Sequence, residues 1–260
     1  MSDPVLYSRQ GATAHLRFNR PQRLNALDKE LAEAFASSVD QAVSDDTVRV
    51  IVLSGEGRGF LAGGDLTHFH QSQDKPEAAR GLIEPIHGAL LKLANSPKIS
   101  IASVHGPVAG GGLSIMLSLD LAIAADDSVF NLSYARIGAS PDCGGSWALP
   151  RIVGTRKALE IALLCDPVKA DEALRLGLVN RVVPKADLEA ETAKLALRLA
   201  EGAPIALGRI KSLVRTAFER DFGAQLDAES EGFQACAGTE DFTNAIDAFL
   251  SKRSPVFEGR

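Results

Sequence analysis

Two glycine-rich segments constrain the fold of this chain more than any other feature: residues 59–65 read GFLAGGD and residues 105–112 read HGPVAGGG. Each follows an apolar, strand-like run and leads into a helix-like pattern. Glycine lets backbone N–H groups approach a ligand, and a helix N-terminus adds unpaired donors and the positive end of a dipole. Two such turns side by side would direct two N–H groups at one oxygen. This arrangement, an oxyanion hole, predicts an enzyme that acts on a carbonyl whose oxygen becomes negative.

Hydrophobic periodicity predicts alternating strands and helices, followed by a helical C-terminal part. We expect strands over residues 5–10, 14–18, 48–53, 99–104, 121–125 and 129–132, and helices over residues 28–43, 77–94, 112–119, 187–202, 204–220, 223–237 and 240–252. Pro85 is expected to kink its helix or to shift the start of that helix. Residues 67–75 are polar and predict a mobile loop. Strand, helix, strand recurs three times, which favours an α/β sheet with helical crossovers.

Composition argues against several function classes. The chain has 260 residues, a formal charge of −5 and no cluster of Lys and Arg, so nucleic acid is not an expected partner. No apolar run reaches the length of a membrane span, and residues 1–4 do not resemble a signal peptide. The three cysteines are scattered, lack zinc-ligand spacing and suit a reducing compartment. We therefore expect a cytoplasmic protein with no membrane contact and no metal site.

Five blocks of sequence occur in the order and spacing of a known family: residues 19–27 (NRPQRLNAL), 58–65 (RGFLAGGD), 108–112 (VAGGG), 141–145 (PDCGG) and 249–253 (FLSKR). With them the chain resembles the crotonase, or enoyl-CoA hydratase/isomerase, superfamily over nearly its whole length. The resemblance implies an α/β crotonase (ClpP-like) spiral of ββα turns in residues 1–190, carrying the CoA and active sites. It also implies a C-terminal helical trimerisation region in residues 191–260, and hence a homotrimer or a dimer of trimers.

The resemblance assigns roles to individual residues. The N–H groups of Gly64 and Gly111 would form the oxyanion hole for the carbonyl oxygen of an acyl-CoA thioester. The CoA-binding positions are Arg23, Ala26, Ala62, Asp65, Phe233 and Lys252, and the acyl-pocket positions are Leu66, His87, Ser114 and Tyr134. From the residues alone, Arg23 and Lys252 can also be solvated surface charges, Phe233 a helix-packing residue and Asp65 a helix N-cap. With no P-loop or dinucleotide fingerprint, we expect no cofactor beyond the CoA thioester itself.

The acid/base residues depart from the hydratase pattern. Hydratases of the family use two glutamates, which would fall at Ser114 and Tyr134. A serine hydroxyl is a poor proton acceptor, and a tyrosine is a weak acid with a pKa of about 10. The remaining carboxylate is Asp142, and one carboxylate suffices to move a proton between two carbons of an enolate. The PDCGG block is similar to the branch of 1,2-epoxyphenylacetyl-CoA isomerases in phenylacetate catabolism and of Δ3,Δ2-enoyl-CoA isomerases, so we expect an isomerase.

Alternatives remain open from the sequence. Asp142 can instead be the N-cap of a helix that starts near residue 145. The enzyme can be a hydratase with atypical acid/base groups, or a hydrolase like the 4-chlorobenzoyl-CoA dehalogenases, in which Asp142 would be a nucleophile and His87 a base. From another class, the chain can be a non-catalytic CoA-binding protein. Cys143 is expected to pack rather than react, and His105 to bond backbone.

Overall fold

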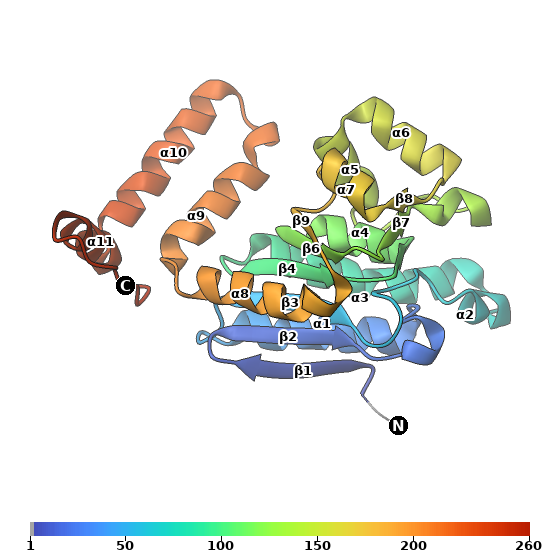
Figure 1. The fold of residues 1–260 in the computed structure, drawn as a ribbon. Coiled ribbons are helices and arrows are strands. Elements are labelled where there is room, and N and C mark those ends of the chain that lie inside the picture. The colour runs from blue at the N-terminus through green and yellow to red at the C-terminus, as the bar shows by residue number, and fades with distance from the viewer. Residues whose placement is uncertain (1–2) are drawn as a thin grey trace.

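A six-stranded sheet forms the centre of the molecule, which a computed structural model describes over residues 3–260 (Figure 1). In spatial order its strands are β1 (Val5–Gln10), β2 (Thr13–Phe18), β3 (Val50–Gly55), β4 (Ile99–Val104), β6 (Leu121–Ala125) and β9 (Arg181–Val183). Only the β1–β2 hairpin is antiparallel; the other neighbours are parallel. A smaller sheet contains β5 (Pro107–Ala109), β7 (Val129–Asn131) and β8 (Val168–Lys169).

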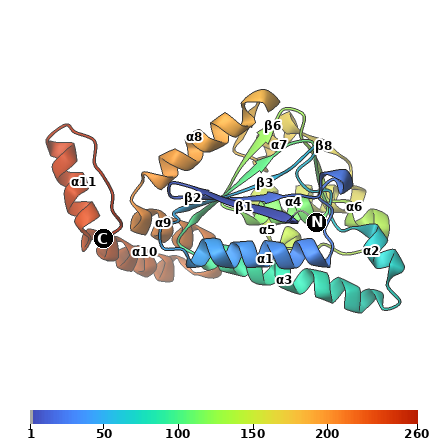
Figure 2. The same cartoon turned by 90° about the horizontal axis from the view of Figure 1, so that it is seen from below.

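Helices cover both faces of the large sheet, which explains its continuous apolar strands. On one face, α1 (Lys29–Ser44) and α3 (Lys75–Asn95) lie side by side (Figure 2). On the other face lies α8 (Leu188–Ala200). Side chains alternate along β3, so that Ile51 belongs to the core under α1 and α3 while Val52 belongs to the core under α8.

Further helices and short 3₁₀ turns are formed by the segments that connect the strands. They are α2 (Leu66–Gln71), α4 (Gly111–Ser118), α5 (Gly145–Val153), α6 (Thr155–Leu164) and α7 (Ala170–Leu176), with short 3₁₀ turns η1 (Pro21–Arg23), η2 (Ser133–Ile137) and η3 (Lys185–Asp187). The chain then forms α9 (Pro204–Arg215), η4 (Ala217–Glu219), α10 (Phe222–Ala237) and α11 (Glu240–Leu250). The last two helices extend away from the sheet as an arm (Figures 1 and 2). Phe233 and Phe249 on this arm are 66% and 83% exposed.

A partly buried ion cluster holds α9 against the sheet. Lys211 Nζ donates to Asp120 Oδ2 at 2.9 Å and to the carbonyl oxygens of Leu93 and Lys98, and Arg215 Nε donates to Asp120 Oδ1 at 2.8 Å. Burial lowers the pKa of Lys211, and the neighbouring Asp120 opposes that shift. Removing Asp120 would leave the buried charge of Lys211 uncompensated, so these contacts help to hold α9 in place.

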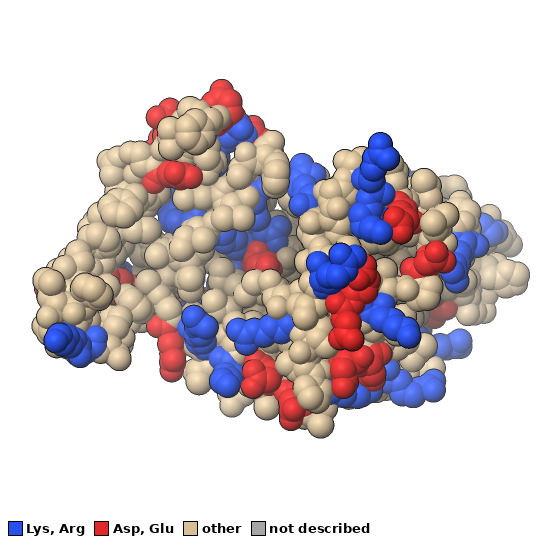
Figure 3. Space-filling model, turned by 45° about the horizontal axis from the view of Figure 1, so that its top comes forward, with Lys and Arg blue, Asp and Glu red and all other residues tan. Residues whose placement is uncertain are grey.

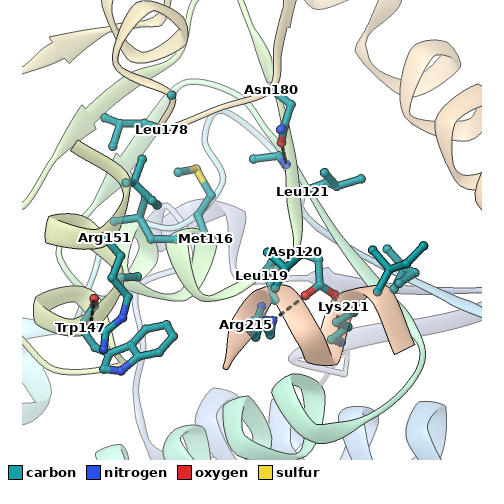
Figure 4. A pocket seen from close by; sticks show the side chains of 18 of the residues that line it. Met116, Leu119, Asp120, Leu121, Trp147, Arg151, Leu178, Asn180, Lys211 and Arg215 are labelled. Atoms are coloured by element: carbon teal, nitrogen blue, oxygen red, sulfur yellow. Dashed lines mark hydrogen bonds and ion pairs between the residues drawn. The ribbon is translucent and has the colours of Figure 1, made fainter. Parts of the chain in front are cut away.

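The same cluster borders a cavity of about 480 Å³ between α9, α4 and α5. Figure 4 shows its lining, in which the Arg151 guanidinium lies 4.0 Å from the centre of the Trp147 ring. In the space-filling view the molecule is hollowed between the arm and the sheet, and acidic and basic side chains alternate over the visible face (Figure 3). The cavity lies at the C-terminal end of α4, away from the glycine turn at the N-terminal end of this helix.

Most predicted elements are confirmed within a few residues. Strands β1, β4 and β6 have the expected bounds, and Asp28 caps α1 by accepting from the N–H of Leu31 at 2.9 Å. Helix α3 runs through Pro85 without a shifted start, because Asp74 caps it and Pro76 occupies its first turn. The predicted mobile loop over residues 67–75 was wrong: Asp65 accepts from the N–H of Thr67 and initiates α2 there.

Two further comparisons with the sequence concern the second half of the chain. Helices α6 and α7 and strands β8 and β9 had no counterpart among the predicted elements. The predicted division between residues 1–190 and 191–260 falls inside α8, whose Leu188, Leu195 and Ala196 belong to the core beneath the sheet. That division stays a prediction. None of the helices formed by residues 3–260 combines the length and apolar character needed to cross a membrane.

Candidate functional site

The two glycine-rich turns lie directly against each other. The N–H of Ala109 donates to the carbonyl oxygen of Leu61 at 2.9 Å, which joins the turns at their bases. A side chain on Gly63 would begin 3.2 Å from the carbonyl oxygen of Ala109 and 3.6 Å from the nitrogen of Gly111. Gly63 has φ 97° and Gly110 has φ 49°, a backbone region that favours glycine. The predicted meeting of the turns is therefore present in the fold.

Two N–H groups at this junction are free to bind a ligand. Within residues 3–260, neither Gly64 nor Gly111 donates its N–H in a hydrogen bond. Their neighbours do: Asp65 donates to the carbonyl oxygen of Leu27 at 2.7 Å, and Gly110 donates to that of Asn131 at 2.9 Å. Gly111 is the first residue of α4, where N–H groups have no partner inside the helix. The donors are those that the resemblance assigns to the oxyanion hole.

The open face of Gly111 looks toward a carboxylate. A methyl group placed on this glycine would lie 3.8 Å from Asp142 Oδ1, 3.7 Å from Tyr134 Oη and 3.2 Å from Leu27 Cδ1. The neighbouring Gly112 differs, because a methyl group there would lie 2.2 Å from the carbonyl oxygen of Leu61. Gly112 is thus required for packing, whereas Gly111 faces the space that Tyr134 and Asp142 border. The structure brings the predicted oxyanion donor and the predicted acid/base residue together.

Three side chains form a hydrogen-bonded chain at this position. The hydroxyl of Tyr134 donates to Asp142 Oδ1, and Ser114 Oγ lies 3.1 Å from Tyr134 Oη. Burial of Tyr134, reinforced by the charge of Asp142, raises the pKa of the phenol, so Tyr134 remains a protonated donor at neutral pH. Asp142 itself is half-buried. Asp142 is thus the one carboxylate in this chain of three side chains.

The alternative role of Asp142 as a helix cap is wrong. Helix α5 begins at Gly145, its N-cap is Gly144, and no side chain caps it. Only the backbone carbonyl of Asp142 takes part in the helix start, by accepting from the N–H of Gly145 at 3.0 Å. The carboxylate is therefore available to the site.

Ser114, where a hydratase would carry a glutamate, is closely packed. A side chain on Gly145 would begin 2.3 Å from Ser114 Oγ, so the hydroxyl touches the first turn of α5. A glutamate at position 114 would need α5 to move. The start of α5 leaves room for a serine at position 114 but not for a glutamate. Asp142 is therefore the one carboxylate in this part of the site.

The backbone that follows Asp142 has an unusual conformation. Cys143 has φ 50° and Gly144 has φ 80°, both in the left-handed region. The N–H of Cys143 donates to His87 Nε2 on α3 at 3.1 Å. Burial, together with Asp142, raises the pKa of the Cys143 thiol, which keeps it unreactive and agrees with the predicted packing role. His105 contacts backbone as expected, with Nε2 2.9 Å from the carbonyl oxygen of Gly57.

Asn25 and Arg20 support the first turn, and the sequence reasoning missed both. Asn25 is buried, with φ 58°, and donates to the carbonyl oxygens of Gly59 at 2.9 Å and Phe60 at 3.0 Å. Arg20 forms ion pairs with Asp28 at 2.9 Å and Asp65 at 3.3 Å. The signal was the asparagine within the NRPQRLNAL block, a residue type that adopts φ > 0 more readily than most.

Asp65 is occupied by these contacts. Burial alone would raise the pKa of its carboxyl, but hydrogen bonds from Thr67 and Arg20 outweigh it and lower the pKa. Its predicted capping role is confirmed. Residues 24–27 run beside the same turn, since Ala62 donates to the carbonyl oxygen of Leu24 at 3.1 Å. Ala26 and Ala62 therefore lie near the proposed oxyanion donors, and Arg23 lies exposed at the end of η1.

The remaining predicted site residues are placed differently. Leu66 is the exposed first residue of α2, and the ring edge of Phe69 on that helix lies 3.0 Å from where a side chain on Gly64 would begin. Phe233 on α10 and Lys252 after α11 lie on the arm, at the opposite end of the molecule from α2 (Figures 1 and 2). Within a single chain, Phe233 and Lys252 are therefore not close to the glycine turns. Among residues 3–260, no three His, Cys, Asp or Glu side chains are grouped as metal ligands.

Comparisons with known proteins agree on the family. The sequence profile described as Enoyl-CoA hydratase/isomerase matches residues 8–260. A 1,2-epoxyphenylacetyl-CoA isomerase from Escherichia coli (strain K12) is 37% identical over 248 residues, covering 94% of each chain. A short-chain-enoyl-CoA hydratase from Clostridium acetobutylicum is 32% identical over 250 residues, covering 96% of this chain and 95% of the relative. The crystal structure of an enoyl-CoA hydratase from Polaromonas sp. JS666 matches with a TM-score of 0.93 at 33% identity, covering 98% of this chain and 99% of that one.

These matches extend over nearly the whole chain and agree with the two joined glycine turns and the sheet with helical crossovers. The relatives include both an isomerase and a hydratase, so the family alone does not distinguish the two reactions. The protein is an acyl-CoA enzyme of the crotonase fold and belongs to the enoyl-CoA hydratase/isomerase family.

Proposed function

We propose that this protein isomerises an unsaturated or ring-containing acyl-CoA through a thioester enolate, with Asp142 as the general acid and base. The observation that carries the proposal is the single carboxylate held opposite Gly111, where Tyr134 donates to Asp142 Oδ1. The family resemblance adds that Ser114 and Tyr134 stand at the two positions where hydratases would have glutamates. Hydration needs a second group to position and activate water, whereas isomerisation needs one group that removes a proton and returns it.

The chemistry follows from this arrangement. The thioester oxygen accepts from the N–H groups of Gly64 and Gly111, which together stabilise the negative charge that develops when a proton leaves carbon. One donor of this kind contributes about 3 kcal/mol in other enzymes. Because Tyr134 occupies Oδ1 of Asp142, the second oxygen takes the proton from one carbon and returns it to another. The enolate electrons form the new double bond, and no net proton, electron or water is consumed.

The resemblance of the sequence to the epoxyphenylacetyl-CoA isomerase branch also supports this proposal, since a relative with that name is 37% identical to this chain. A dehalogenase-like hydrolysis would require His87 as a base. The Nε2 of His87 already accepts from the N–H of Cys143, which argues against that role.

We propose further that CoA binds along residues 23–26 and the backbone of Ala62, with Leu66 and Tyr134 at the acyl pocket, and that no other cofactor is used. We also propose a homotrimer or a dimer of trimers in the cytoplasm. Phe233 and Lys252 lie on the arm, so a contact of theirs with CoA requires that the arm of one copy reach the site of another. The exposed phenylalanines of the arm favour such packing.

The test is incubation of the protein with a 3-enoyl-CoA in deuterated water, with Asp142→Asn alongside. We expect 2-enoyl-CoA to accumulate, measured by absorbance, with deuterium incorporated at carbon, measured by mass. The variant should lose about 10²-fold or more in rate while still binding acyl-CoA. A wild-type protein that binds acyl-CoA but neither isomerises it nor exchanges its α-proton, with ring-containing acyl groups included, would leave the non-catalytic binding alternative in place.

A further inference from the structure

His87 contacts the catalytic loop through one defined hydrogen bond. Its Nε2 accepts the N–H of Cys143, the residue next to Asp142, at 3.1 Å. In this contact the ring nitrogen is the acceptor and the backbone N–H is the donor. The ring comes from α3, whose Leu82, Ile86 and Leu90 are buried in the core. His87 Nε2 thus provides a hydrogen-bond acceptor for the loop that contains Cys143, from a helix that is packed into the core.

The backbone of Cys143, whose N–H donates this bond, has a conformation that must be stabilised by other contacts. Cys143 has φ 50°, and a residue other than glycine is unfavourable in this region unless its surroundings compensate. Both sides of Cys143 are held by side chains: His87 accepts from its N–H, and Ser118 Oγ donates to its carbonyl oxygen at 3.0 Å. The peptide that carries this N–H joins Cys143 to Asp142, so the bond to His87 restrains the backbone next to the Asp142 side chain.

We propose that His87 is a positioning residue, which keeps the Asp142 carboxylate at the open face of Gly111 by fixing the peptide of Cys143. The proposal rests on the isomerase function proposed above, because it concerns the base of that reaction. It assigns His87 no contact with the reacting atoms. Tyr134 fixes one oxygen of the carboxylate, and His87 fixes the backbone from which the carboxylate extends. Displacing a catalytic group by about 1 Å is enough to lower a rate by about 10²-fold.

Three variants test the proposal by kinetics. His87→Leu removes the acceptor, His87→Gln replaces it with an amide oxygen that can accept the same N–H, and Glu84→Gln is a control at an exposed position one turn earlier on α3. We expect His87→Leu to lower kcat by about ten- to a hundredfold with KM within about twofold. We expect His87→Gln to keep kcat within about threefold and the control to match the wild type. A His87→Leu enzyme with wild-type kcat, or a folded His87→Gln enzyme as slow as His87→Leu, would overturn the proposal.

A second readout does not depend on activity. The chain has three cysteines, so ¹⁵N-cysteine labelling gives three amide signals, and that of Cys143 is identified by its loss in Cys143→Ser. We expect hydrogen exchange at Cys143 to be faster in His87→Leu than in the wild type, with Cys165 unchanged as the internal reference. Equal exchange in both proteins would refute the bond and the positioning role. If the wild type proves inactive, the proposed function fails, and the amide measurement still decides the role of His87. If His87→Leu does not fold, a folded His87→Gln that loses protection at Cys143 overturns the proposal.

Discussion

The hydroxyl of Tyr134 donates a hydrogen bond to Oδ1 of Asp142, eight residues further along the chain. The bond joins the 3₁₀ turn η2 to the loop that precedes α5. It holds Asp142 Oδ1 3.8 Å from the point where a side chain on Gly111, the first residue of α4, would begin. The sequence resemblance predicts a glutamate at this position in a hydratase, whereas here Tyr134 supplies a hydrogen-bond donor to Asp142.

Tyr134→Phe should lower kcat by about ten- to a hundredfold, since a hydrogen bond to a charged group contributes about 1.5–3 kcal/mol. KM should change little, because the phenol bonds Asp142 and Ser114. The matched control is Tyr7→Phe, the other tyrosine of the chain, whose buried hydroxyl has no hydrogen-bond partner within residues 3–260. Steady-state kinetics of both variants checks this. Equal rates for Tyr134→Phe and Tyr7→Phe would show that the bond to Asp142 does not affect the reaction.

Gly111→Ala and Gly112→Ala should separate function from folding. A methyl group on Gly111 lies 3.2 Å from the flexible end of Leu27, so the protein should fold, but this methyl projects toward Asp142 and should lower kcat/KM by about 10²-fold. A methyl group on Gly112 meets the backbone oxygen of Leu61 at 2.2 Å and should prevent normal folding. Thermal melts and kinetics of the two variants test this. Comparable melting temperatures for the two would contradict the packing described here.

Asn25→Ala should destabilise the fold by about 3 kcal/mol or more, because the buried carbonyl oxygens of Gly59 and Phe60 each lose a donor. Asn25→Gly loses the same bonds but tolerates φ 58°, so it should be about 1 kcal/mol more stable than Asn25→Ala. Urea unfolding measures both free energies. An Asn25→Ala variant within about 0.5 kcal/mol of wild type, the effect of an ordinary surface change, would show that the hydrogen bonds of Asn25 do not stabilise the fold.

His15 should make the stability of the protein fall as the pH is lowered. Burial lowers the pKa of His15, and the positive charge of Arg17 lowers it further, while Glu189 opposes both. The unfolded chain therefore binds more protons than the folded one between the lowered pKa and the ordinary value of about 6.5, and stability rises with pH across that window. His15→Gln should reduce this rise of the melting temperature, which the wild type shows at pH values below the ordinary histidine pKa of about 6.5. A pH dependence identical to that of the wild type would contradict the shift.

Sequence reasoning was most successful where the pattern is local. The alternation of Val5–Gln10, the apolar run of Ile99–Val104 and the cap at Asp28 determine their elements through contacts within a few residues. It failed at α2, where the N-cap hydrogen bond of Asp65 starts a helix in a segment whose polar composition predicted a loop. It also failed over residues 155–183, where no element was predicted and the structure contains α6, β8, α7 and β9. The roles of individual site residues stay predictions until the variants are measured.

The glycine turns were predictable because their requirement is local: Gly63 and Gly110 adopt φ values that few other residues tolerate, and a helix after each turn leaves N–H groups unpaired. That Asp142 was the available carboxylate also followed from the sequence. The sequence did not show which groups hold this carboxylate in place. Ser114, Tyr134 and His87 come from three separate helical elements, and only the packing of those elements brings their side chains to one loop. Bond partners across a core depend on tertiary distances, which no spacing along the chain encodes.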